Sequence, residues 1–538
     1  MIEKLIENWL INVHELGYTI PFCELLLSNG YTIIKISRQG RGELGKDVIA
    51  RHPDGQLHTF QLKGPKDIDL PEWRRIQDEI RDLVQLPAID PSVNREEPHT
   101  PFLVTNGEIV GDALQSVEEY ATDWERRGYP RLRTMQRHEL LRMFIDAHGS
   151  YLPTGRVDVR QFVEFYVIDF GDRLPRKKLA AFLERLVSAE AVEGRGRNPK
   201  RAIESMVLMG GYILEQYERA QNHVSAAEGW TIVAATILHV AQRENLPARQ
   251  YESSLSLVWE ALDNNLRLLE REVLERKHFV EPEYIISETD FIRGVRTLIT
   301  LGWLTAMCLT RALKPEEGAA NRELFNVVRK NFSGIKLSGE ADWPYVVCLS
   351  LYLEKWVGSS QAEWLLENWV ESIMAANRSE GAEGVPPPYW LQEKILALRY
   401  GQLPPYKAER FDEHSYTIHS ALDMLVRRLC RQFVSRSWPE ASRLTFCDYI
   451  PDSPAERFLW RSTEGDLQMV VSQQPASWSE WRSSVSVVRR DSVPSLLLKH
   501  PEWILPFALT YPHRINRPLS AAIDCLIGER ASWDDPDQ

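Results

Sequence analysis

The sequence predicts an α/β unit with a mixed sheet at the N-terminus, followed by a large region that is mainly α-helical. Two observations lead to this fold class. Short β-rich runs alternate with amphipathic helical patterns over about the first 150 residues, and strand-like alternation largely disappears after them. The chain has 538 residues, far more than one average domain, so several domains are expected.

The N-terminal elements follow from local patterns. Apolar residues at helical spacing begin the chain, and a β-rich run follows Asn29-Gly30. Two further β-rich runs flank a turn rich in Pro, Asp and Gly, which indicates a β-hairpin. The expected helices cover 2–16, 21–28, 70–86 and 111–127, and the expected strands cover 31–36, 48–50, 57–62 and 102–106.

The rest of the chain is dominated by helical spacing. Glycine and three prolines at 382–388 indicate a linker, so we expect a first domain at 1–148, a helical sensor or assembly domain at 149–381 and a mainly helical domain at 389–538. Near the end, 467–472 and 484–489 have strand character. The expected helices cover 159–168, 176–187, 202–221, 230–244, 253–275, 291–312, 321–331, 343–356 and 419–433.

Composition excludes several classes of protein. The net charge is −12, so the chain is not coated in basic surface, although a local basic patch remains compatible with nucleic-acid binding. No uninterrupted apolar run approaches the ~20 residues that span a bilayer, and no basic-then-apolar signal begins the sequence. Six scattered cysteines without a Cys-x-x-Cys pair indicate neither a disulfide framework nor structural zinc. We therefore expect a cytoplasmic protein that does not enter a membrane.

The hairpin carries the chemistry-bearing residues of the first domain. Asp47 precedes its first strand, and Gln61 and Lys63 lie near the end of its second strand. Side chains two residues apart share one face of a strand, so Gln61 and Lys63 should point the same way, beside Asp47. Taken singly, Asp47 capping a turn and two solvent-facing strand residues would explain these positions. Their convergence favours a functional site.

Mg²⁺, or Mn²⁺ in its place, prefers oxygen ligands and keeps several waters. Asp47 would supply charge, and the amide oxygen of Gln61 a neutral ligand. Glu24, on the preceding helix, would reach the cation directly or through water, although an exposed helix glutamate is an alternative for it. Such a cation polarises a phosphoryl oxygen and acidifies water, and Lys63 would stabilise the developing charge.

These motifs, in this order, resemble the PD-(D/E)XK nuclease superfamily, within it the Mrr-like restriction endonucleases. The resemblance covers roughly the first 130 residues and implies a restriction-endonuclease-like α/β domain that cleaves DNA. It also implies catalytic roles for Asp47, Gln61, Lys63 and Glu24. The matching stretches are Phe22-Cys-Glu24-Leu-Leu26, Gly40-Arg-Gly42-Glu-Leu-Gly45-Lys-Asp47, Gln61-Leu-Lys63 and Leu103-Val-Thr-Asn106-Gly-Glu.

Arg38, Gln39 and Arg41, in the loop before Asp47, are candidates for binding phosphates of a nucleic acid, with a solvated loop as the alternative. A nuclease joined to a helical region looks like a regulated effector of bacterial anti-phage defence. We expect activation by a protein partner or by self-assembly, with a homo-oligomer as the working form. Two alternatives stay open: a degenerate nuclease fold that acts as a nucleic-acid-binding scaffold, and an RNase that uses the same site.

Overall fold

In a computed structural model of the protein, the contacts divide the chain into two units, residues 1–264 and 265–538. The predicted borders at 148, 381 and 388 stay predictions. The structure describes residues 2–37, 45–64, 66–148, 160, 162–165, 169–187, 198–275, 287–313, 322–378, 385–401, 414–449, 467–470, 477–489, 493–529 and 532–533.

The first unit contains a five-stranded mixed sheet in the order β1-β2-β3-β4-β5. Strand β2 runs antiparallel to both of its neighbours, β1 and β3, whereas β3, β4 and β5 run parallel to one another. The predicted hairpin is present, with Val48 opposite Phe60. Strand β5, at the edge of this sheet, was not predicted from the sequence because it has only three residues. The strands are β1 (Thr32–Ile36), β2 (Val48–Arg51), β3 (Leu57–Lys63), β4 (His99–Thr105) and β5 (Arg133–Met135).

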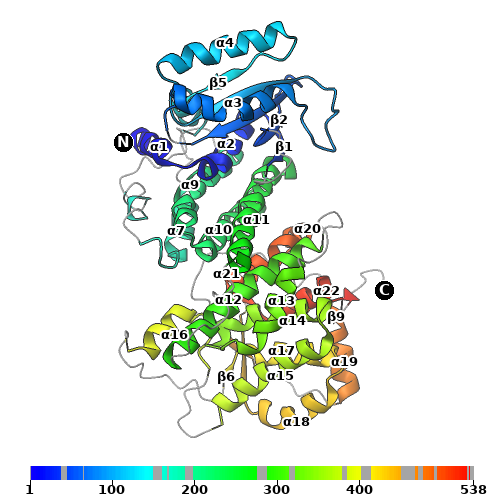
Figure 1. Ribbon diagram of the computed structural model, residues 1–538. Helices are drawn as coiled ribbons and strands as arrows, with labels where there is room; N and C mark the ends of the chain where they lie inside the picture. The colour runs from blue at the N-terminus through cyan, green and yellow to red at the C-terminus, as the bar shows by residue number, and fades with distance from the viewer. Residues whose placement is uncertain are drawn as a thin grey trace. The chain divides into compact units, whose positions relative to one another are not determined.

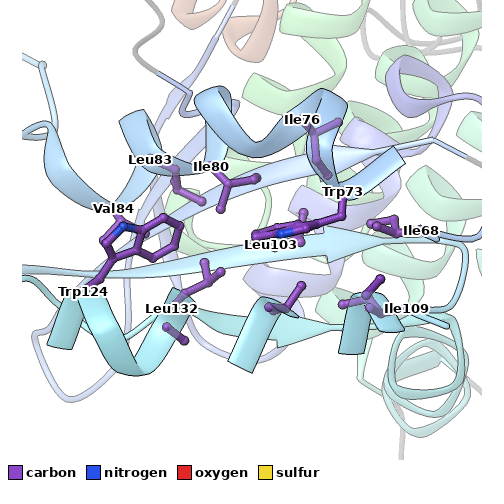
Figure 2. Packing of buried hydrophobic residues seen from close by; sticks show 13 residues of the cluster. Ile68, Trp73, Ile76, Ile80, Leu83, Val84, Leu103, Ile109, Trp124 and Leu132 are labelled. Carbon is purple, nitrogen blue, oxygen red and sulfur yellow. The ribbon is translucent and has the colours of Figure 1, made fainter. Parts of the chain in front are cut away.

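Helices α3 (Leu70–Gln85) and α4 (Asp112–Arg126) cover one face of this sheet, and α2 (Glu15–Ser28) contacts β1 and β3 (Figure 1). Asp69 caps α3 by accepting a hydrogen bond from the N–H of Glu72. Apolar side chains spaced three or four residues apart then form a buried stripe on α3. Figure 2 shows this stripe, which includes Trp73, Ile76, Ile80 and Leu83, packed with residues of β4 and α4.

Helix α2 is buried on two sides, because each side packs against a different layer of the first unit. Phe22 contacts Phe60 of β3, with ring centroids 5.3 Å apart. On the other side, Pro21 lies next to Gly211 of α9 (Pro199–Arg219), where an added Cβ would come within 3.1 Å of the proline ring. A helix that is apolar nearly all round is typical of a buried position. Helix α2 therefore joins the sheet to the helices that follow it.

The remainder of the chain is mainly helical, as the sequence predicts. The other helices of the first unit are α1 (Ile2–Asn12), α5 (Arg137–His148), α7 (Arg176–Val187), α10 (His223–Arg243) and α11 (Glu252–Glu275), the last of which continues past residue 264. The helices of the second unit are α12 (Ser287–Arg311), α13 (Arg322–Asn331), α14 (Trp343–Trp356), α15 (Ser359–Ala376), α16 (Gln392–Arg399), α17 (Ile418–Arg427), α18 (Arg431–Ala441), α19 (Trp478–Ser486), α20 (Ser495–Lys499), α21 (Ile504–Thr510) and α22 (Arg517–Leu526).

Short strands complete the second unit. One predicted strand is present as β8, but the strand predicted at 484–489 is wrong over its first half, where α19 continues to Ser486. Of the predicted linker, only 385–388 is described, and it is packed: the N–H of Glu340 donates to the carbonyl of Pro386. The strands are β6 (His414–Ser415), β7 (Thr445–Tyr449), β8 (Leu467–Val470), β9 (Val487–Val488) and β10 (Ser532–Trp533).

Two of the described helices are long and apolar enough to cross a membrane, judged by length and composition. They are α10 and residues Phe291–Arg311 of α12. Their apolar windows are 83% and 72% buried inside the protein, as core helices of soluble proteins are. This burial is compatible with a soluble protein, and the cytoplasmic location stays a prediction.

Candidate functional site

Asp47 and Gln61 meet at the end of the β2–β3 hairpin. The N–H of Asp47 donates to the carbonyl of Phe60 at 2.9 Å, which extends the strand pairing by one residue. Gln61 Nε2 donates to Asp47 Oδ2 at 2.7 Å, and the N–H of Leu62 donates to the same oxygen at 2.6 Å. The hairpin therefore brings together the carboxylate and the amide that the sequence singles out.

The other amide atom of Gln61, Oε1, is buried and has no hydrogen-bond partner among the described residues. A buried acceptor without a partner costs about 1–3 kcal/mol. The oxygen and nitrogen of an amide exchange places when the group rotates by half a turn. In that orientation Oε1 would lie beside the carboxylate of Asp47, an oxygen pair that a cation stabilises. The donor set fits a hard divalent cation.

Lys63 lies on the same face of β3 as Gln61. Because Phe60 packs against α2, its neighbours in the alternation, Gln61 and Lys63, face the other side, where α3 lies. The ammonium of Lys63 is 2.6 Å from the carboxylate of Glu79 on α3 and 3.8 Å from that of Glu15 on α2. The Lys63 side chain is only 13% exposed. These three charges therefore share one small, partly enclosed region.

Tyr18 of α2 fixes the end of β3 from the opposite side. Its hydroxyl donates to the carbonyl of Lys63 at 2.9 Å and accepts from the N–H of Lys63 at 3.2 Å. Burial raises the pKa of Tyr18 well above its usual value, and the charges of Glu15 and Asp47 raise it further. Tyr18 is therefore a neutral donor that holds the backbone of Lys63 in place.

Acidic and basic side chains lie together around the hairpin. Glu15 and Glu79 contact the ammonium of Lys63, and the guanidinium of Arg75 also interacts with both carboxylates. Over the described part of the chain, no three His, Cys, Asp or Glu side chains come together in a way that would hold a metal ion. A cation here would thus depend on Asp47, the Gln61 amide, backbone carbonyls and water, a set that suits Mg²⁺ better than zinc.

Glu24 lies elsewhere. It is nine residues beyond Glu15 on α2, which is roughly 13 Å along the helix and half a turn around it. Its carboxylate is fully buried and accepts a hydrogen bond from Ser254 of α11 at 3.0 Å. Burial raises the pKa of Glu24, and the charge of Glu204 on α9 raises it further. The geometry does not support the metal-ligand and catalytic roles predicted for Glu24.

The structure instead adds three residues that sequence reasoning missed. Glu15 and Tyr18 are three residues apart on α2 and therefore share one side of that helix. Phe22 continues the same stripe, and counting back from it by helical spacing would have located both. Glu79 had no such signal, because the pairing of a helix residue with a distant strand depends on tertiary packing. The predicted phosphate-binding residues Arg38, Gln39 and Arg41 lie outside the described residues.

Comparison with known proteins gives no match for this chain. No protein-family model, no curated protein and no solved structure matches it. The relation to the Mrr-like nucleases thus remains a resemblance of short motifs, and any functional conclusion depends on the site itself.

Proposed function

We propose that this protein is a metal-dependent endonuclease that hydrolyses phosphodiester bonds of DNA. The observation that carries the proposal is the contact between Asp47 and Gln61, with a buried amide oxygen that lacks a partner, on the face of β3 that also presents Lys63. The mixed sheet in which β3 is a central strand, flanked by helices on both faces, is compatible with the restriction-endonuclease-like domain that the motifs imply.

Each residue has a distinct part in the proposed reaction. Asp47 and the amide oxygen of Gln61 would hold Mg²⁺ or Mn²⁺, which supplies polarisation of a phosphoryl oxygen and acidification of water. The ammonium of Lys63 would face the charge that develops on the phosphorus oxygens during attack by water. Tyr18 keeps the Lys63 backbone fixed, so the ammonium is placed before the substrate arrives.

DNA is the proposed substrate because the Mrr-like resemblance implies it. The net charge of −12 indicates weak intrinsic affinity for a polyanion. We therefore propose that cleavage is regulated: the helical region would respond to a protein partner or to self-assembly as a homo-oligomer. This suits a cytoplasmic effector of anti-phage defence, in which an unregulated nuclease would damage its own host.

The test is cleavage of supercoiled plasmid with Mg²⁺ or Mn²⁺ by the wild type, Asp47→Ala and Lys63→Ala. We expect each substitution to slow cleavage by roughly 10²-fold or more, the usual effect of removing one electrostatic partner of the transition state. Asp78→Ala and Lys66→Ala are matched controls, because Asp78 is a solvent-exposed acid on α3 and Lys66 is exposed. Unchanged cleavage by both site variants would exclude the site.

A second candidate is a degenerate nuclease fold that acts as a nucleic-acid-binding scaffold. It is favoured by the lack, within the described ranges, of any group of three acidic, His or Cys ligands. Calorimetric titration with Mn²⁺ separates the two: heat of binding that Asp47→Ala abolishes supports the nuclease, and no binding supports the scaffold. Parallel digestion of RNA by the wild type tests whether the same site acts as an RNase.

A further inference from the structure

The segment that leads to Asp47 rests directly on the last turns of α3. Gly45 has a φ of +68°, and a Cβ added there would come within 2.4 Å of the carbonyl oxygen of Glu79 and 2.9 Å of the N atom of Leu83. The next residue, Lys46, is buried and donates from Nζ to the carbonyl of Asp82 at 3.2 Å. Residues 79–83 of α3 therefore fix where the backbone before Asp47 runs.

The same turn of α3 reaches the other half of the site. The carboxylate of Glu79 lies 2.6 Å from the ammonium of Lys63. Asp78 and Glu72, by contrast, pair with Arg81 and Arg75 of α3 itself, at spacings of three residues. One short part of α3 thus contacts both the Asp47 segment, through its backbone, and Lys63, through a side chain.

The ion pair contributes little to stability. The Glu79 side chain is 53% exposed, and ion pairs at such positions are screened by water. Its effect is on geometry: a lysine has four rotatable side-chain bonds, and a carboxylate partner selects one direction for its ammonium. Without Glu79, Lys63 would keep only the more distant Glu15, at 3.8 Å.

We infer that Glu79 is a positioning residue, which holds the ammonium of Lys63 beside the Asp47–Gln61 pair while α3 holds the backbone before Asp47. The inference rests on the proposed function. Glu79 acts through Lys63 and not through the cation. Two consequences follow: the loss caused by changing Glu79 requires Lys63, and the Mg²⁺ concentration that gives half-maximal cleavage does not depend on Glu79.

A double-mutant cycle tests both consequences in the full-length protein, with enzyme in excess over plasmid. We expect Glu79→Gln to slow cleavage about 10-fold or more, Glu79→Asp to recover part of the rate, and Glu79→Gln to cost nothing further in a Lys63→Ala background. Asp78→Asn is the matched control and should cleave like the wild type. Full additivity of the two losses, a raised requirement for Mg²⁺, or faster cleavage by Glu79→Gln would each overturn the inference.

A second measurement does not depend on cleavage. Acetylation of Lys63, followed by mass spectrometry and referred to the exposed Lys66 in the same sample, reports how firmly the ammonium is held. We expect Glu79→Gln to raise labelling of Lys63 several-fold and Asp78→Asn to leave it unchanged. Equal labelling in Glu79→Gln and wild type overturns the inference even if DNA is cut. If the wild type cuts no DNA, the proposed function fails, and labelling alone decides whether Glu79 fixes Lys63.

Discussion

The hairpin site (Asp47, Gln61 and Lys63) and a cluster around Glu340 in the second unit are both built from a carboxylate beside backbone and side-chain donors. They differ in how completely their polar atoms are paired. The buried carboxylate of Glu340 accepts from the hydroxyls of Ser415 and Thr417 and from the N–H groups of Tyr416 and Thr417. In the hairpin site, by contrast, the amide oxygen of Gln61 is buried without a hydrogen-bond partner in the described structure.

The pairing around Glu340 indicates a structural role. Thr417 is the residue before α17, so Glu340 satisfies N–H groups at the beginning of that helix, which otherwise lack partners. One of its oxygens accepts four of these hydrogen bonds, and the other accepts from the N–H of Tyr416. The hairpin site keeps one buried acceptor, the amide oxygen of Gln61, without a hydrogen-bond partner in the described structure.

The largest effect on stability is expected from Glu340→Ala. This substitution removes the acceptor of the buried hydroxyls of Ser415 and Thr417 and of the N–H of Tyr416, each at about 1–3 kcal/mol, so the free energy of unfolding should fall by about 3 kcal/mol or more. Urea denaturation measures it. Asp47→Asn, which keeps an oxygen for Leu62 and removes a like-charge neighbour, should change stability by less than about 1 kcal/mol. Equal losses in the two variants would remove the distinction between the clusters.

The next effect concerns the close approach of α3 to the hairpin site. Gly45→Ala places a methyl group against the backbone of α3 and keeps a left-handed residue, so we expect a loss of about 2–4 kcal/mol. Gly55→Ala, at a φ of +89° with nothing within 4 Å of its Cβ, should cost only the conformational part, about 1–2 kcal/mol. The difference between the two, from thermal or urea unfolding, isolates the contact with α3. Equal losses of stability in the two variants would mean that α3 moves away from the added methyl group at no measurable cost.

Local sequence patterns predict much of the fold but only part of the site. The hairpin, α3 and the helices between residues 198 and 356 follow from spacing and turn residues, and alternation along β3 places Gln61 and Lys63 on one face. The helix predicted at 419–433 is divided into α17 and α18. The ligand role predicted for Glu24 stays a prediction that the geometry does not support, because its carboxylate is buried and accepts a hydrogen bond from Ser254 of α11. Glu79 reaches Lys63 through a contact between distant segments, which no local pattern encodes.

Lys46 should have a smaller effect on the free energy of unfolding, and this effect depends on pH. Burial lowers its pKa from 10.5 to about 8, although the charge of Asp82 opposes the shift. Because the folded-state pKa lies below the unfolded value, the unfolded chain binds more protons between pH 8 and 10.5, and stability rises with pH across that window. The gain is at most about 3 kcal/mol.

Lys46→Met should remove that gain, so its free energy of unfolding should change less between pH 8 and 10.5 than that of the wild type. Urea denaturation at several pH values measures the two slopes. Lys66→Met serves as the control, because Lys66 is exposed and its loss should leave the slope unchanged. Parallel slopes for Lys46→Met and wild type would show that Lys46 does not carry a buried charge.

The smallest effect is expected from Glu24→Gln, which makes the same chemical change as Asp47→Asn at the other predicted acid. Since burial and Glu204 raise the pKa of Glu24, the folded state holds its proton to higher pH, and the stability that this proton contributes is lost as pH rises from about 4.5 through the folded-state pKa. A glutamine mimics the protonated acid, so the variant should lose less stability over that range. Its metal-dependent cleavage should stay within about twofold of wild type, while Asp47→Asn cleaves at a small fraction of that rate. If Glu24→Gln instead abolished cleavage in a folded protein, α2 would have to present Glu24 to the cation in the working state, and the site would extend beyond the hairpin.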